Sequence, residues 1–106
     1  MTDWYHGSPE RLTVLLPGST ISQDRELAEA FAHRPTIVSD SRQEGGPLEH
    51  NGTTPGFLYR VDEWVDDGDV QPVPESTMPG NEWLTTRPLR VTCIRELPVV
   101  PTGDAR

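Results

Sequence analysis

The sequence of 106 residues contains no lysine, a single cysteine and no apolar run long enough to cross a bilayer. One cysteine cannot form an internal disulfide, and it excludes a cysteine-rich metal site. Cys93 lies in an alternating apolar segment, which predicts a buried structural thiol. The first residues lack the features of a signal peptide, so we expect a cytoplasmic protein that does not enter membranes.

Positive charge is also scarce, because 9 arginines stand against 17 acidic residues and the net charge is -8. An acidic chain is repelled by phosphate backbones, and this argues against general nucleic-acid binding. The length fits one domain, which we expect over residues 1–97, followed by a loose tail over 98–106. The 11 prolines and 9 glycines indicate many short elements joined by fixed turns.

The segment QDRELAEAFAHRP (residues 23–35) predicts the one clear helix. Acids occupy its first turn, Leu27 and Phe31 have i,i+4 spacing, Pro35 ends it, and Ser22 is the expected cap. Strands are expected at 3–7, 19–22, 36–40, 57–65 and in two parts of 82–97 split near Arg87-Pro88. A packed connection is expected at 12–18, a loop or hairpin at 41–56, an acidic turn at 66–69 and extended chain at 70–81. This order predicts an α+β fold with largely antiparallel sheets.

Polar groups that can serve chemistry stand at three places in this pattern. His6 ends the first strand with Gly7 behind it, so it is either a hydrogen-bonded structural residue or a group aimed at a ligand hydroxyl. Thr20 alternates to the opposite face from Ile21, where its hydroxyl can face a cleft. Glu82 opens a late strand, either as a solvated carboxylate or, across a cleft from His6, as a group that stabilises positive charge.

Other conspicuous residues have plainer interpretations. The three histidines lack metal-ligand spacing, and the acidic turn lacks the loop spacing of a calcium site. The three tryptophans are predicted to belong to the core or to a cleft wall rather than to a stacking platform for nucleic acid; they are Trp4, Trp64 and Trp83.

The order of these motifs resembles the ADP-ribosyltransferase fold, in which two small, mostly antiparallel sheets form an NAD-binding cleft. The matching segments are YHGS at 5–8, STIS at 19–22 before ELAEAFA, GFLYRVDE at 56–63 and EWLTTRPLRV at 82–91. The layout is most similar to the small rifamycin-modifying (rifampin) ADP-ribosyltransferases, which also have a Tyr-His-Gly opening, a Pro-Gly-Asn turn and a Pro-Leu-Arg strand. The resemblance spans nearly the whole chain.

This resemblance implies transfer of ADP-ribose from NAD, as co-substrate, to a small molecule or macromolecule, with release of nicotinamide. His6 would contact a ribose hydroxyl and the Gly7 backbone would hold the nicotinamide carboxamide. Phe31 or Tyr59 would supply an aromatic face for the ring. Thr20, with Ser22 as neighbour, takes the position of a Tyr in the rifamycin-type enzymes, and in this the chain is similar to the Ser-Thr-Ser lineage of transferases.

Glu82, by the same resemblance, would hold the ribose 2′-hydroxyl and favour an oxocarbenium-like transition state. Asp67 and Asp69 are rivals for this role, because the rifamycin-type enzymes use an Asp near the acidic turn. Gly80 stands where transferases acting on protein Arg or Asn carry a carboxylate or Gln, so Arg modification is disfavoured. Loops 41–55 and 66–80 would have to supply the acceptor site.

Three other functions remain open from the sequence. The protein can hydrolyse NAD without an acceptor, or it can be a non-catalytic acidic module of the same fold that binds a nucleotide or a protein partner. A tRNA 2′-phosphotransferase-like activity is the third, and the lack of basic surface argues against it.

Overall fold

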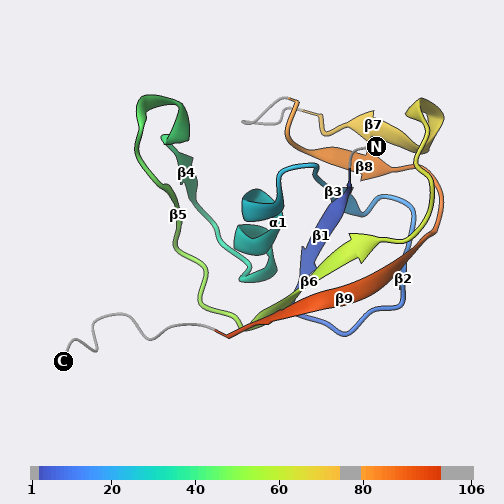
Figure 1. The fold of residues 1–106 in the computed structure, drawn as a ribbon, viewed down its shortest axis with the longest axis horizontal. Coiled ribbons are helices and arrows are strands. Elements are labelled where there is room, and N and C mark those ends of the chain that lie inside the picture. The colour runs from blue at the N-terminus through green and yellow to red at the C-terminus, as the bar shows by residue number, and fades with distance from the viewer. Residues whose placement is uncertain (1–2, 75–79, 99–106) are drawn as a thin grey trace.

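The structure of the protein, a computed structural model, describes residues 3–74 and 80–98. In these ranges it contains one α-helix and short strands that all pair antiparallel, which confirms the predicted α+β class (Figure 1). The strands form sheets of four, three and two strands, whereas two sheets were expected. No helix of the described residues is long and apolar enough to cross a membrane.

The four-stranded sheet carries most of the core. Its order is β1 (Tyr5–Ser8), β6 (Gly56–Val61), β9 (Leu89–Leu97) and β2 (Val14–Leu15). Alternation along β6 directs Leu58 toward the helix and Tyr59 into the cluster on the opposite face of the sheet. Strand β6 ends at Val61 rather than at the predicted residue 65. Strand β2 lies within the segment expected to be only a packed connection.

The three-stranded sheet has the order β3 (Thr20–Ile21), β8 (Trp83–Thr85) and β7 (Val70–Pro72). It meets the first sheet at one bridge, where Tyr5 and Ser22 exchange backbone hydrogen bonds of 2.7 and 2.9 Å. Past this bridge β1 and β3 belong to different sheets. The split of the last β region near Arg87-Pro88 is confirmed, because β8 ends at Thr85 and β9 begins at Leu89.

The helix α1 (Arg25–Ala32) packs against β1 and β6 with Leu27, Ala28, Ala30 and Ala32 buried. Its N-cap is Asp24, whose side chain accepts a hydrogen bond from the Leu27 N–H, so the prediction of Ser22 as cap was wrong by two residues. Ser22 instead accepts a bond from the Asp24 N–H, and this fixes the turn that leads into the helix.

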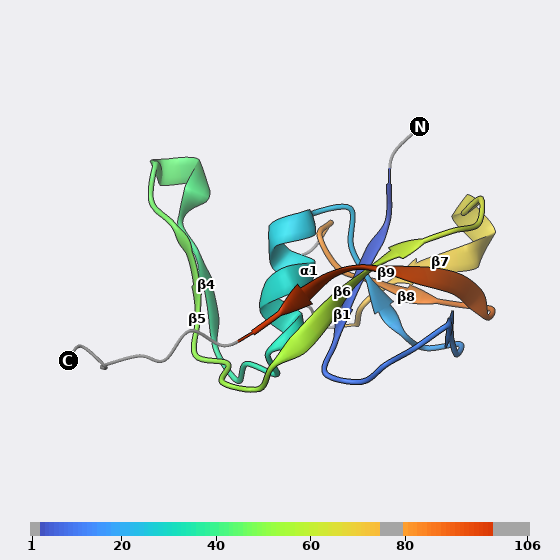
Figure 2. The same cartoon turned by 60° about the horizontal axis from the view of Figure 1, so that its bottom comes forward.

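The hairpin of β4 (Val38–Asp40) and β5 (Leu48–His50) resolves the choice between loop and hairpin for residues 41–56. It stands on the side of α1 away from the two larger sheets (Figure 2). The 3₁₀ turn η1 (Arg42–Glu44) connects its strands. Arg42 joins the hairpin to the helix by an ion pair with Asp24, with 2.5 Å between nitrogen and oxygen. Hydrogen bonds from the Arg42 guanidinium also lower the pKa of Asp40 to about 2.

Cys93 is exposed, whereas the sequence predicted a buried thiol. It pairs with Tyr59, before the register between β6 and β9 shifts, so the alternation of Leu89, Val91 and Cys93 is intact. Alternation gives the face of the sheet on which a side chain lies, but not whether other segments cover that part of the face. Trp64 is 63% exposed because the chain leaves the sheet after Val61, but it lines a cavity and so agrees with the predicted cleft wall. Trp4 and Trp83 do pack against the core, as expected.

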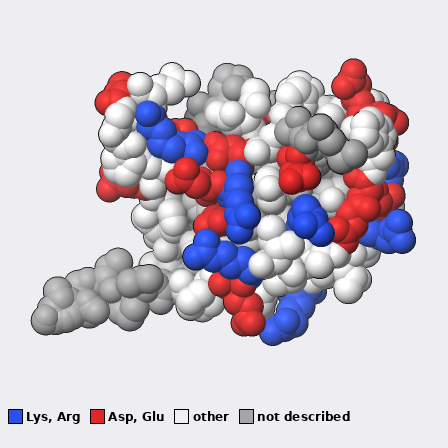
Figure 3. All heavy atoms as spheres, viewed as in Figure 1, with Lys and Arg blue, Asp and Glu red and all other residues white. Residues whose placement is uncertain are grey.

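The acidic turn contains the 3₁₀ turn η2 (Asp67–Asp69), closed by reciprocal hydrogen bonds between Asp66 and Asp69. Acidic and arginine side chains are interspersed on the face of the molecule drawn in Figure 3. The predicted extended segment over 70–81 is a strand at β7, and its residues 75–79 lie outside the described residues. The predicted loose tail lies outside them too, except for Pro98.

Candidate functional site between strands β1 and β3

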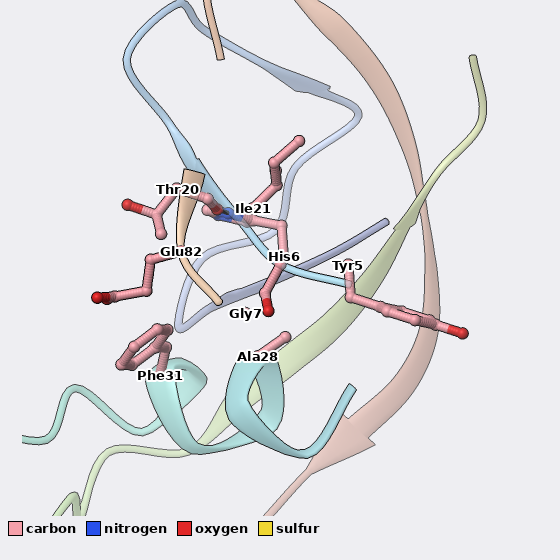
Figure 4. A pocket seen from close by; sticks show the side chains of 9 residues that line it. Tyr5, His6, Gly7, Thr20, Ile21, Ala28, Phe31 and Glu82 are labelled. Atoms are coloured by element: carbon pink, nitrogen blue, oxygen red, sulfur yellow. Dashed lines mark hydrogen bonds between the residues drawn. The ribbon is translucent and has the colours of Figure 1, made fainter. Parts of the chain in front are cut away.

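A cavity of about 240 Å³ lies where the two larger sheets separate past the Tyr5–Ser22 bridge. Strand β1, the β3 segment, the helix and the residue before β8 all contribute to its walls (Figure 4). The lining residues are Tyr5, His6, Gly7, Thr20, Ile21, Ser22, Ala28, Phe31 and Glu82. Six of the seven predicted site residues therefore line one cavity, although they come from segments far apart in the sequence.

His6 is held by a hydrogen bond of 2.6 Å between its Nδ1 and the Thr20 carbonyl oxygen. A carbonyl only accepts, so Nδ1 carries the hydrogen and Nε2 of the neutral ring keeps a lone pair. Burial lowers the pKa of His6, and the bond to Thr20 opposes this shift only in part. The ring is therefore neutral near pH 7. It has a structural bond on one nitrogen and an acceptor for a hydroxyl on the other.

Gly7 offers its backbone to the cavity. The backbone N–H and C=O of His6 point toward β6, whereas those of Tyr5 point to Ser22 on the other edge of β1. Because these groups alternate along an antiparallel strand, the N–H and C=O of Gly7 point to the same edge as those of Tyr5. This edge borders the cavity. An adjacent donor and acceptor of this kind match the two groups of a primary carboxamide.

The hydroxyl residues of the β3 segment differ in what they offer. Thr20 is half-buried, and its hydroxyl points to the same side as the Glu82 carboxylate in Figure 4. Ser22 is 1% exposed and its oxygen accepts the Asp24 N–H, which leaves only its O–H to donate. Thr20 is therefore the more accessible hydroxyl of the two.

Of the two aromatic candidates, Phe31 lines the cavity and Tyr59 does not present a ring face. Tyr59 is 1% exposed in the core, and its hydroxyl accepts the Leu12 N–H at 2.8 Å and donates to the Glu10 carbonyl at 2.6 Å. A ring enclosed in this way cannot stack on a ligand, so the prediction for Tyr59 was wrong. Phe31 lies on α1 and is half-buried, with its ring below Glu82 in Figure 4.

Glu82 is the only carboxylate among the described residues that line this cavity. Its rivals lie elsewhere. Asp69 accepts a hydrogen bond from Arg87 Nε at 2.9 Å, and this bond lowers the pKa of Asp69. Asp67 lines a second cavity, which has no residue in common with the first. The geometry thus brings Glu82, and neither aspartate, to the same cavity as His6.

Sequence reasoning missed three lining residues, Tyr5, Ile21 and Ala28. Ala28 stands three residues before Phe31, so helical periodicity alone places both on one face of α1. The close approach of the helix to β1 at Gly7 is a tertiary contact that no local pattern predicts. Among the described residues, no group of three His, Cys, Asp or Glu side chains gathers to hold a metal ion.

The lowered pKa of His6 predicts a loss of stability in weak acid. The unfolded ring titrates near 6.5 and the folded one below it, so the unfolded chain binds more protons below about pH 6.5. The free energy of unfolding should therefore fall as pH decreases from 7 to 5, above the range in which the carboxylates titrate. Urea unfolding at several pH values and NMR titration of the His6 ring measure this.

The pKa of His50 is also lowered, by burial and then by the charge of the stacked His33. His50→Gln removes this second contribution and is therefore the control that isolates the effect of His6. A His6 midpoint at or above 6.5 would contradict the prediction.

Comparison with protein-family models, with curated proteins and with solved structures finds no match for this chain. Membership of a family is therefore not established, and the functional argument depends on the cavity and on the short motifs.

Proposed function

We propose that the protein is an NAD-dependent ADP-ribosyltransferase whose cavity between β1 and β3 holds the nicotinamide and its ribose. The observation that carries the proposal is the convergence of His6, Gly7 and Glu82 on one cavity with an aromatic wall at Phe31. The volume of about 240 Å³ suits a ring and a sugar rather than a whole dinucleotide, so the adenosine half would lie outside it.

Each lining group has a defined task in this proposal. The N–H and C=O of Gly7 bind the nicotinamide carboxamide, and Phe31 packs on the ring. Nε2 of His6 accepts a hydrogen bond from a ribose hydroxyl. Glu82 accepts a hydrogen bond from the ribose 2′-hydroxyl, and its negative charge stabilises the sugar as positive charge develops at C1′. These residues suit a dissociative reaction, because the nicotinamide ring of NAD is positively charged and leaves as a neutral molecule.

The bond changes balance without a further reactant. The bond between ribose C1′ and the nicotinamide nitrogen breaks, and its electron pair leaves with nicotinamide, which becomes neutral. An acceptor oxygen or nitrogen, or water, forms the new bond to C1′ and loses a proton to solvent or to Glu82. With water the protein is an NAD glycohydrolase; with an acceptor it is a transferase.

Incubation with NAD and measurement of nicotinamide by chromatography test this proposal. We expect nicotinamide to be released faster than from NAD in buffer without the protein. We also expect NAD to raise the melting temperature, because a ligand that binds the folded state stabilises it. A rise in melting temperature without release would identify the non-catalytic nucleotide-binding module instead. Neither release nor a shift, with water and with candidate acceptors, would overturn both functions.

A further inference from the structure

A second cavity, also of about 240 Å³, lies beside the loop that follows β6 and is called the second cavity below. It shares no lining residue with the first, so what it binds does not depend on the proposed function. Its walls combine indoles, valines and acids. The lining residues are Asp3, Trp4, Gln23, Val61, Glu63, Trp64, Val65 and Asp67.

The two indoles of this cavity are fixed in different ways. Trp4 packs against the core and meets Trp83 edge-on, with ring centroids 6.3 Å apart and planes at 89°. Trp64 is 63% exposed, yet its Nε1 donates to Asp66 at 2.5 Å and its carbonyl accepts from Arg87 at 3.0 Å. Hydrogen bonds therefore orient an indole that the core does not enclose. Exposing so large an apolar side chain costs free energy that a bound ligand would recover.

The charge around the indoles has one sign. Three of the lining residues are acidic and none is Arg or His. Glu63 is compensated by Arg87, at 3.0 Å, and by the Arg90 N–H. Asp3 and Asp67 have no ion pair among the described residues, so their charge acts on whatever enters the cavity.

We propose that this cavity binds a small organic cation, with an alkylated ammonium group against the indoles and the carboxylates of Asp3 and Asp67 at its rim. The faces of indole rings carry negative potential and attract such groups, while the valines accept their methyl groups. A neutral ligand would gain no charge attraction from the carboxylates, and an anion would be repelled by them.

The test compares two probes of the same shape. Choline carries a trimethylammonium group, and 3,3-dimethylbutan-1-ol replaces its nitrogen by carbon, so only the charge differs. NMR titration of the indole N–H signals should shift those of Trp4 and Trp64 with choline. We expect the neutral alcohol to bind at least about 5-fold more weakly, since a cation over an indole gains a factor of this order.

Variants locate the binding. Trp64→Ala and Asp67→Asn should each weaken choline binding, and because both side chains are exposed the variants should keep the melting temperature of the wild type. Leu16→Ala, at another exposed side chain, is the matched control and should bind as wild type does. Equal binding of the two probes, unchanged choline binding in Trp64→Ala, or no shift of either indole signal would each overturn the proposal.

Discussion

Glu82→Gln is expected to lower the rate of nicotinamide release about 10²- to 10³-fold while NAD binding changes little. The substitution keeps the shape and hydrogen-bonding capacity of the side chain and removes its charge. Since that charge is needed only as the sugar becomes positive, the loss should appear in kcat rather than in affinity. Release kinetics give the first quantity, and the NAD-dependent rise in melting temperature gives the second.

The matched controls for Glu82→Gln are the two rival acids. Asp67→Asn removes an exposed carboxylate of the second cavity and should leave release unchanged. Asp69→Asn removes the negative charge from the ion pair with Arg87 and should lower the melting temperature rather than the intrinsic rate. If Asp69→Asn lost release as completely as Glu82→Gln while still folded, the choice of carboxylate would be wrong. If Glu82→Gln kept the wild-type rate, Glu82 would have no part in the reaction.

The elements that the sequence predicted well are those with strong local signals. The i,i+4 spacing of Leu27 and Phe31 predicts the helix, although it spans Arg25–Ala32 and ends three residues before Pro35, and Arg87-Pro88 separates the last two strands. Glu82 stands directly before β8, as predicted, whereas His6 is the second residue of β1 and not the end of the strand that the sequence had predicted. At both positions the backbone period and the turn residues limit where a side chain can point.

The predictions that failed depended on contacts between distant segments. The alternation along β6 places Tyr59 on one face of the sheet, but it does not show that β2, β3 and the loop at Glu10 cover this face. The Tyr59 hydroxyl donates a hydrogen bond to that loop. Cys93 alternates with Leu89 and Val91 and is still exposed, because alternation along one strand does not reveal which part of a sheet face other segments cover. The second cavity was not predicted either, because Trp4 and Trp64 are brought together only when β1 pairs with β6.

Gly7→Ala is expected to destabilise the fold strongly. A Cβ at this position would lie 1.9 Å from the Ala28 carbonyl oxygen and 2.7 Å from the Ala32 nitrogen. Both are backbone atoms of α1, which cannot rotate away as a side chain can, so the helix and β1 must separate. Such overpacking costs about 1–3 kcal/mol or more. In a domain of this size each kcal/mol lowers the melting temperature by about 4–8 °C, which calorimetry measures.

Gly68→Ala is the control, because a Cβ there meets nothing within 4 Å and the melting temperature should change little. Equal melting temperatures of the two variants would contradict the close approach of helix and strand. The comparison also separates two reasons for a glycine at position 7. Helix packing requires it whatever the cavity binds, so loss of nicotinamide release in Gly7→Ala is no evidence that its backbone holds the carboxamide. That role is tested by comparing nicotinamide with nicotinic acid in the wild type: a carboxylate presents no donor to the Gly7 carbonyl and should bind more weakly.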